Sequence, residues 1–76
     1  MMPLSLAAVG VEQMVKQIQG CGKTSHHLGN LGFTVGGTVM VISELGGDLI
    51  VNVKDTRIAI SKNLAHKIMV GKVLKS

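Results

Sequence analysis

Apolar and polar residues alternate along much of the chain with the period of two that is typical of β-strands. The alternation is clearest in residues 38–44 and 48–54, which Leu45-Gly46-Gly47 separates. Glycine supplies the positive φ angles of tight hairpin turns, so these two stretches are predicted to form a β-hairpin. Asp55-Thr56 predicts a second turn, and residues 57–60 are predicted to form the next strand.

Shorter stretches complete the predicted set of strands. Leu4 and Leu6, on either side of Ser5, predict a first strand that ends near Gly10, and residues 14–19 predict a second, because apolar side chains interleave with polar ones in both. Near the C-terminus, Ser61 can cap a single turn of helix. Residues 68–70 then predict the last strand, and the tail 71–76 is expected to fray.

One segment, between Gly22 and Gly32, predicts a helix. Thr24 is a suitable N-cap residue, and Leu28 and Leu31 stand three apart on one helical face. Gly32 suits the left-handed position that ends a helix. Five or six short strands, with one short helix between the second and third, fit a mostly β, SH3-like barrel, which leaves few strand edges open.

The composition limits the chain to one small globular domain. Of its 76 residues, 46% are apolar and only 16% are charged, which is not typical of a disordered chain. The domain is expected to span residues 1–76 with its core at about 4–70, because a chain of this length buries a single core.

Membrane insertion and export are not expected. No apolar stretch reaches the about 20 residues of a spanning helix, and the N-terminus lacks the basic start of a signal peptide. The single cysteine, Cys21, cannot form an internal disulfide. Small domains in oxidising compartments usually carry several disulfides, so a reducing, cytoplasmic location is predicted.

Several segments, read in order, form a recognisable combination: Leu28-Gly29-Asn30-Leu31-Gly32-Phe33, Val35-Gly36, Val39-Met40-Val41, the Gly46-Gly47 turn, Arg57-Ile58-Ala59-Ile60, and Leu64-Ala65-His66-Lys67-Ile68-Met69-Val70. Together they closely resemble the FeoA family, from about Leu4 to Val70. The resemblance implies an SH3-like barrel and a cytoplasmic accessory protein of bacterial ferrous iron uptake. The implied partner is FeoB, an inner-membrane permease with a cytosolic GTPase domain, which would hold the chain at the membrane periphery.

The same fold occurs as the C-terminal domain of iron-dependent, DtxR-type repressors. The resemblance therefore leaves an alternative function open: a metal-responsive regulatory or sensor module in which Cys21 and His26 would matter. Residues just before Leu28 are often basic in the family, and here they are His26 and His27.

Enzymatic chemistry is not expected. All of the acidic residues fall at predicted strand ends and turns, where carboxylates are ordinarily solvated: Glu12, Glu44, Asp48 and Asp55. A nucleophile made from Cys21 and a nearby histidine would lack a third, orienting group. The chain also has no GxxxxGK[ST] loop for binding nucleotide phosphates.

Cys21, His26 and His27 are the candidate metal ligands, because thiolate and imidazole groups suit Zn²⁺ or a similar divalent ion. Adjacent residues of a helix point about 100° apart, so only one histidine would readily join Cys21. Two ligands make a weak site or one shared between two copies, which would give a weak homo-oligomer. We therefore predict no resident metal or other cofactor, with Cys21 and His26 as the alternative.

The formal net charge of +4 suggests an anionic partner. The basic residues are scattered and form no run, and Phe33 is the only aromatic residue available for stacking on bases. Nucleic acid is therefore not the expected partner. A protein-binding surface is expected where apolar helix residues meet positive charge, with Leu28 as the anchor at the rim; its predicted members are Lys23, His27, Leu28, Leu31, Val35 and Leu45.

Overall fold

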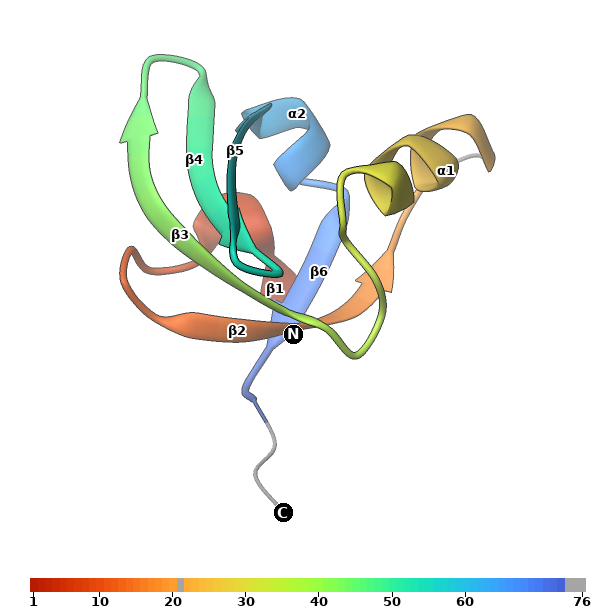
Figure 1. The fold of residues 1–76 in the computed structure, drawn as a ribbon, viewed down its shortest axis with the longest axis horizontal. Coiled ribbons are helices and arrows are strands. Elements are labelled where there is room, and N and C mark those ends of the chain that lie inside the picture. The colour runs from red at the N-terminus through yellow and green to blue at the C-terminus, as the bar shows by residue number, and fades with distance from the viewer. Residues whose placement is uncertain (21, 74–76) are drawn as a thin grey trace.

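Six strands and three short helices make up the described part of the computed structural model, residues 1–20 and 22–73 (Figure 1). The strands form one antiparallel sheet in the order β1-β6-β2-β3-β4-β5. None of these helices is long and apolar enough to cross a membrane. The elements are β1 (Met2–Pro3), the 3-10 helix η1 (Leu4–Leu6), β2 (Glu12–Ile18), α1 (Gly22–Asn30), β3 (Thr38–Leu45), β4 (Asp48–Val53), β5 (Thr56–Ser61), α2 (Lys62–Ala65) and β6 (Ile68–Gly71).

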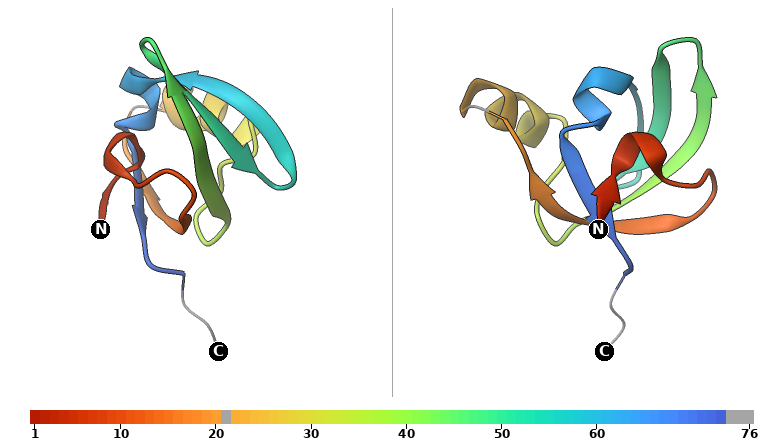
Figure 2. Two further views of the ribbon diagram at one scale, coloured as in Figure 1. Left: turned by 90° about the vertical axis from the view of Figure 1, so that its left-hand side faces the viewer. Right: turned by 180° about the vertical axis from the view of Figure 1, so that it is seen from behind.

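The sheet curls because β2 serves two partners. Its first half pairs with β3, where Glu12 lies opposite Met40, and its second half pairs with β6, where Ile18 lies opposite Ile68. A register shift interrupts the β2–β6 ladder and another interrupts the β3–β4 ladder, and such bulges bend and twist a strand. The short helix α2 contacts both β5 and η1, which follows β1, and so bridges the two edges of the sheet (Figure 2). The predicted mostly β, SH3-like barrel, with one helix between the second and third strands of this sheet, is confirmed.

The core consists of the apolar side chains that the strand alternation directs inward. Val41, Val51 and Val53, on the two strands of the predicted hairpin, are at most 2% exposed. Phe33 is 1% exposed and belongs to the same cluster. The other members are Leu4, Val15, Leu28, Val39, Leu49, Ile60, Ala65, Ile68 and Val70. The alternation of residues 38–54 therefore predicted the central hairpin and its buried face correctly.

The first predicted strand is wrong. Leu4–Leu6 forms the 3-10 helix η1, whereas the first strand is Met2–Pro3, which pairs with β6. In a strand Leu4 and Leu6 would share a face, but in a helix of three residues per turn they point to different sides. Leu4 is accordingly fully buried, and Leu6 is 70% exposed.

Of the other predicted element ends, the cap of α2 is confirmed, whereas the cap of α1 and the end of the last strand differ. Ser61 caps α2, because its Oγ accepts a hydrogen bond from a backbone N–H three residues later at 3.2 Å. Thr24 is not the N-cap of α1, which begins at Gly22 and includes Thr24 in its first turn. The last strand extends through Gly71, so the expected tail begins later than predicted, and its residues 74–76 lie outside the described part.

The two-residue turn between β4 and β5 is built from non-glycine residues at positive φ. Lys54 has a φ of 49° and Asp55 a φ of 63°, between Val53 and Thr56, which pair across the hairpin. This is the geometry of a type I′ turn, which asparagine and glycine fill best. Because a Cβ atom disfavours the left-handed region, both positions carry a conformational cost.

Asp55→Gly is expected to raise the free energy of unfolding by about 0.5–1 kcal/mol, because glycine adopts a positive φ without steric cost. For a domain of this size the gain corresponds to roughly 2–8 °C in the thermal midpoint. Asp48→Gly is the matched control, because Asp48 begins β4 without a positive φ. The control is expected to lower stability, and a similar loss in both variants would contradict the cost assigned to Asp55.

Candidate functional site

The helix α1 ends in a Schellman motif that fixes which of Leu28 and Leu31 enters the core. Gly32 has a φ of 107°, and its N–H donates to the Gly29 carbonyl at 3.0 Å. The Phe33 N–H donates to the Leu28 carbonyl at 3.1 Å. These two hydrogen bonds define the motif, which commonly brings the side chains at the two positions of the second bond together. The prediction that Gly32 ends the helix is confirmed.

The expectation that Leu28 lies at the rim of a docking surface is wrong. Leu28 is fully buried in the same core cluster as Phe33, whereas Leu31 is half-buried and packs against the outside of that cluster. The helix therefore directs Leu28 into the core, whereas Leu31 was expected to face inward. Leu28 cannot offer its side chain to a partner without leaving the core.

The exposed face of α1 is polar and basic. Lys23, His26 and His27 are all exposed, and the helix contains no acidic residue. Two further lysines flank its ends: Lys67 lies against Gly20 and Lys54 against Gly32, where an added Cβ would meet their Cδ atoms at 3.7 Å and 3.9 Å. We call Lys23, His26, His27, Lys54 and Lys67 the basic face. The sequence pattern did not place Lys54 and Lys67 beside the helix, because the fold brings them there from distant segments.

Val35 is presented on a separate turn. The Gly37 N–H donates to the Thr34 carbonyl at 2.9 Å, and Gly36 has a φ of 91°, as the third residue of a type II turn requires. This turn is tied to β2, because Gly36 donates to the Val15 carbonyl and the Val15 N–H donates to the Gly37 carbonyl, both at 2.8 Å. Val35 therefore stands at the tip of a fixed turn with 66% of its surface exposed.

Leu45, 74% exposed, lies at the β3–β4 turn, on the opposite side of the molecule from α1 (Figures 1 and 2). The turn is held against α2 by an ion pair between Glu44 and Lys62 and by a hydrogen bond from the Lys62 N–H to the Gly47 carbonyl at 3.0 Å. The six residues of the predicted surface therefore do not form one patch. Their individual roles in partner binding stay predictions.

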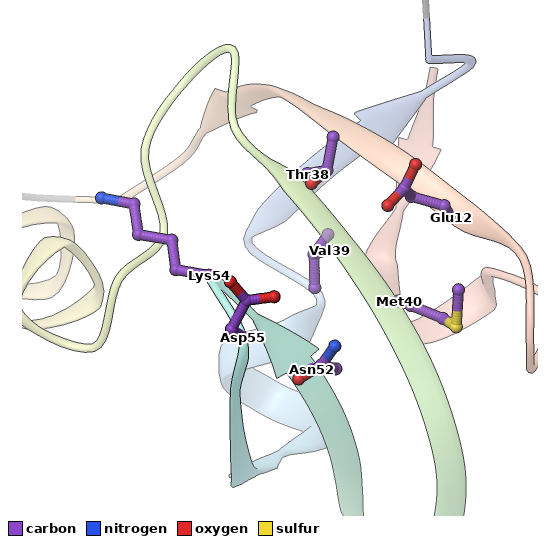
Figure 3. Close-up of a pocket in the computed structure, with 7 residues that line it drawn as sticks. All are labelled: Glu12, Thr38, Val39, Met40, Asn52, Lys54 and Asp55. Carbon is purple, nitrogen blue, oxygen red and sulfur yellow. The ribbon is translucent and has the colours of Figure 1, made fainter.

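A polar hollow of about 200 Å³ lies on the outer face of the sheet (Figure 3). Glu12 and Asp55 stand at its two sides with Asn52 between them, and the Lys54 side chain extends away from it toward α1. Both carboxylates are exposed to solvent. The remaining lining residues are Thr38, Val39 and Met40.

The N-terminal segment carries most of the exposed large apolar side chains of the described residues, a surface that the sequence pattern did not predict. Leu6 is 70%, Val9 58% and Val11 47% exposed. A groove of about 610 Å³ begins beside Val11 and runs between the N-terminal residues and the end of β6; it is lined by Met1, Met2, Val11, Glu12, Gln13, Val70, Gly71, Lys72 and Val73. The misassigned first strand concealed part of this surface, because strand alternation would have turned Leu6 inward together with Leu4.

The candidate metal ligands are only partly described. His26 and His27 are exposed on consecutive positions of α1, and Cys21 lies outside the described residues. Within the described ranges, no group of three or more His, Asp or Glu side chains is placed to hold a metal ion. His66, remote from α1 in sequence, has its Nδ1 3.4 Å from the Ser5 Oγ.

Residues 2–72 match the FeoA domain family. The chain belongs to the FeoA family. It is 41% identical over 71 residues to the Fe(2+) transport protein A of Methanocaldococcus jannaschii, an alignment that covers 92% of this chain and 85% of that protein. Two of the segments that carry the FeoA resemblance, residues 28–33 and 35–36, form the Schellman motif and the Val35 turn, so backbone geometry explains the glycines Gly32 and Gly36.

Two solved FeoA structures share the fold. A crystal structure of the iron uptake regulatory protein FeoA is 34% identical with a TM-score of 0.85, covering 92% of this chain and 93% of that one. Stenotrophomonas maltophilia FeoA, solved in complex with zinc and described as an SH3 domain protein, is 26% identical with a TM-score of 0.82. That match covers 93% of this chain and 91% of the other.

Proposed function

We propose that this FeoA protein is a non-enzymatic accessory protein of ferrous iron uptake that binds the cytoplasmic side of the FeoB permease. Family membership and the 41% identity to an Fe(2+) transport protein support a role in ferrous iron uptake. The basic face supports a docking role, because it gathers positive charge from three separate segments of the chain around one exposed helix. Binding would change FeoB activity through unequal affinity for the conformations of its GTPase-coupled cycle.

The basic face is the feature that carries this proposal. Charges at the rim of an interface mainly accelerate the encounter with an oppositely charged partner and fix its orientation. The contact would therefore need an acidic surface on FeoB and would weaken as salt screens it. Val35 lies on a different turn from the helix, and it would add apolar contact only if the interface extends that far.

Reversing charge on the basic face is expected to weaken binding to FeoB. The double variant Lys23→Glu with Lys67→Glu should bind about tenfold less tightly at low salt, and the difference should shrink at high salt. The measurement is a titration against the cytosolic domain and against intact FeoB separately, with GTP hydrolysis followed in parallel. Lys23→Glu alone is compared with Lys72→Glu, an exposed lysine beyond β6, which makes the same change of charge as that single variant at a distant site. Unchanged affinity in the double variant would remove the basic face from the interface.

The zinc in the S. maltophilia structure supports a second candidate function, a metal-responsive module that would use Cys21 and His26. The two candidates differ in one measurable property. A metal that binds only the folded chain raises its thermal midpoint, so a shift with dilute Zn²⁺ that Cys21→Ala abolishes would favour the second candidate. The docking proposal itself assigns the chain no resident cofactor.

A further inference from the structure

The two edges of the sheet are unequal. At one edge, β1 is two residues long and contains Pro3, and both features discourage further strand pairing. At the other edge, β5 has six residues, contains no proline and pairs with β4 without a register shift. It has no strand partner on its other side within the described chain. The structure therefore leaves one long, regular strand edge open.

The register identifies the backbone groups on this open edge. Because Lys54 and Asp55 form a two-residue type I′ turn, Val53 and Thr56 are the hydrogen-bonded pair that closes the hairpin. Hydrogen-bonded and non-hydrogen-bonded pairs then alternate along the ladder. The N–H and C=O groups of Arg57 and Ala59 consequently point away from β4.

These outward groups are accessible. Arg57 and Ala59 are both exposed, and α2 begins only after Ser61, beyond them in the chain. No hydrogen bond to a loop or helix engages either backbone within residues 1–20 and 22–73. The open edge thus presents a row of donors and acceptors of the kind that an added strand satisfies.

Charge favours an acidic occupant of the edge over a second copy of this chain. Within the described ranges the Arg57 guanidinium forms no ion pair. Arg57 follows Thr56, the first residue after the turn formed by Lys54 and Asp55. The strand and its turn therefore carry an excess of one positive charge. Two copies of a chain with a net charge of +4 would repel each other, whereas an acidic segment would be attracted.

We propose that the β5 edge binds an extended acidic segment of a partner protein as an additional antiparallel or parallel strand. Main-chain hydrogen bonds to Arg57 and Ala59 would supply affinity. An acidic side chain beside Arg57 would supply the preference for acidic over neutral or basic segments. This surface is distinct from the basic face, and the inference does not depend on FeoB being the partner.

A pair of synthetic peptides tests the proposal directly. The probe is a blocked peptide of about seven residues that alternates valine with glutamate, and its control carries N-methyl groups on the backbone amides that would face β5. The unmodified peptide is expected to slow amide hydrogen exchange at Arg57 and Ala59 at least about tenfold when saturating. The N-methylated peptide keeps the same side chains and charge, and it is expected to bind about tenfold more weakly or not at all.

Substitutions in β5 provide a second, independent readout. Ala59→Pro removes an outward N–H without removing a hydrogen bond to β4, and proline is tolerated at such edge positions. It is expected to lower peptide affinity about tenfold, whereas Ala59→Ser, which keeps the N–H, should leave affinity within about twofold. Arg57→Glu should weaken binding of the glutamate peptide and strengthen binding of a matched lysine peptide.

Three results would overturn the proposal. One is equal binding of the unmodified and N-methylated peptides, and another is protection confined to α1. The third is concentration-dependent protection of Arg57 and Ala59 without peptide, together with dimers in sedimentation, since a second copy would then occupy the edge. The docking proposal has a separate test, the binding of the variant Lys23→Glu with Lys67→Glu to FeoB. That variant leaves β5 unaltered, so failure of one proposal can be told from failure of the other.

Discussion

Leu28→Asp is expected to abolish cooperative folding of this FeoA protein. Leu28 is fully buried, so the variant would lose the packing of a core leucine and place a carboxylate among apolar side chains. An unpaired buried charge alone costs several kcal/mol. Domains are stable by about 0.05–0.15 kcal/mol per residue, which is roughly 4–11 kcal/mol for this chain. Circular dichroism and thermal unfolding would show the loss of a cooperative transition.

Ser25→Asp is the control that isolates burial from charge. It puts the same carboxylate on the same helix, at an exposed position in the first turn, where the helix dipole favours negative charge. Its thermal midpoint should match that of the parent or rise slightly. If Leu28→Asp folded as well as Ser25→Asp, the burial of Leu28 would be refuted and the leucine would return as a candidate docking residue.

Phe33→Ala is expected to produce the second largest effect, a loss of about 3–5 kcal/mol in the free energy of unfolding. Phe33 is the only aromatic residue of the chain, it is 1% exposed, and its N–H closes the Schellman motif. In a domain of this size the loss corresponds to a fall of at least about 12 °C in the thermal midpoint. Urea unfolding provides an independent measure of the same quantity.

Phe33→Leu separates the loss of filled volume from the loss of the aromatic ring. Both substitutions leave the backbone N–H bond from position 33 to the Leu28 carbonyl in place. Leucine also refills much of the cavity, so this variant should retain most of the stability. An equal loss in both variants would mean that the aromatic ring itself, rather than the filled volume, is what the core requires.

The sheet could be predicted from the sequence because strand alternation and turn chemistry agree there. Residues 38–54 alternate on both sides of a glycine pair, and the buried valines of that hairpin are the ones that the pattern selects. The strand predicted at Leu4–Leu6 was wrong because three residues contain too little periodicity to distinguish a strand from a 3-10 helix. Only the pairing of Met2 with Val70, at the other end of the chain, decides where the first strand lies.

The candidate site was less predictable than the fold. Leu28 and Leu31 share a helical face, and the sequence cannot say which of them faces the barrel, because that depends on how the Schellman motif joins the helix to Phe33. Lys54 and Lys67 lie beside α1 only after the sheet has formed. A surface assembled from three segments leaves no local pattern for sequence reasoning to detect.

The division of β2 between two partners has a consequence for how the protein is made. Ile18 pairs with Ile68, 50 residues farther along, and Met2 pairs with Val70, so β6 joins both the first strand and half of the second. β6 is synthesised after the other five strands of this sheet, whereas β3, β4 and β5 are consecutive hairpin strands that can pair before β6 is made. Closure of the barrel therefore has to wait for the synthesis of β6. A nascent or truncated chain that stops before Ile68 leaves β1 and the second half of β2 without strand partners, as a ready target for proteases and chaperones.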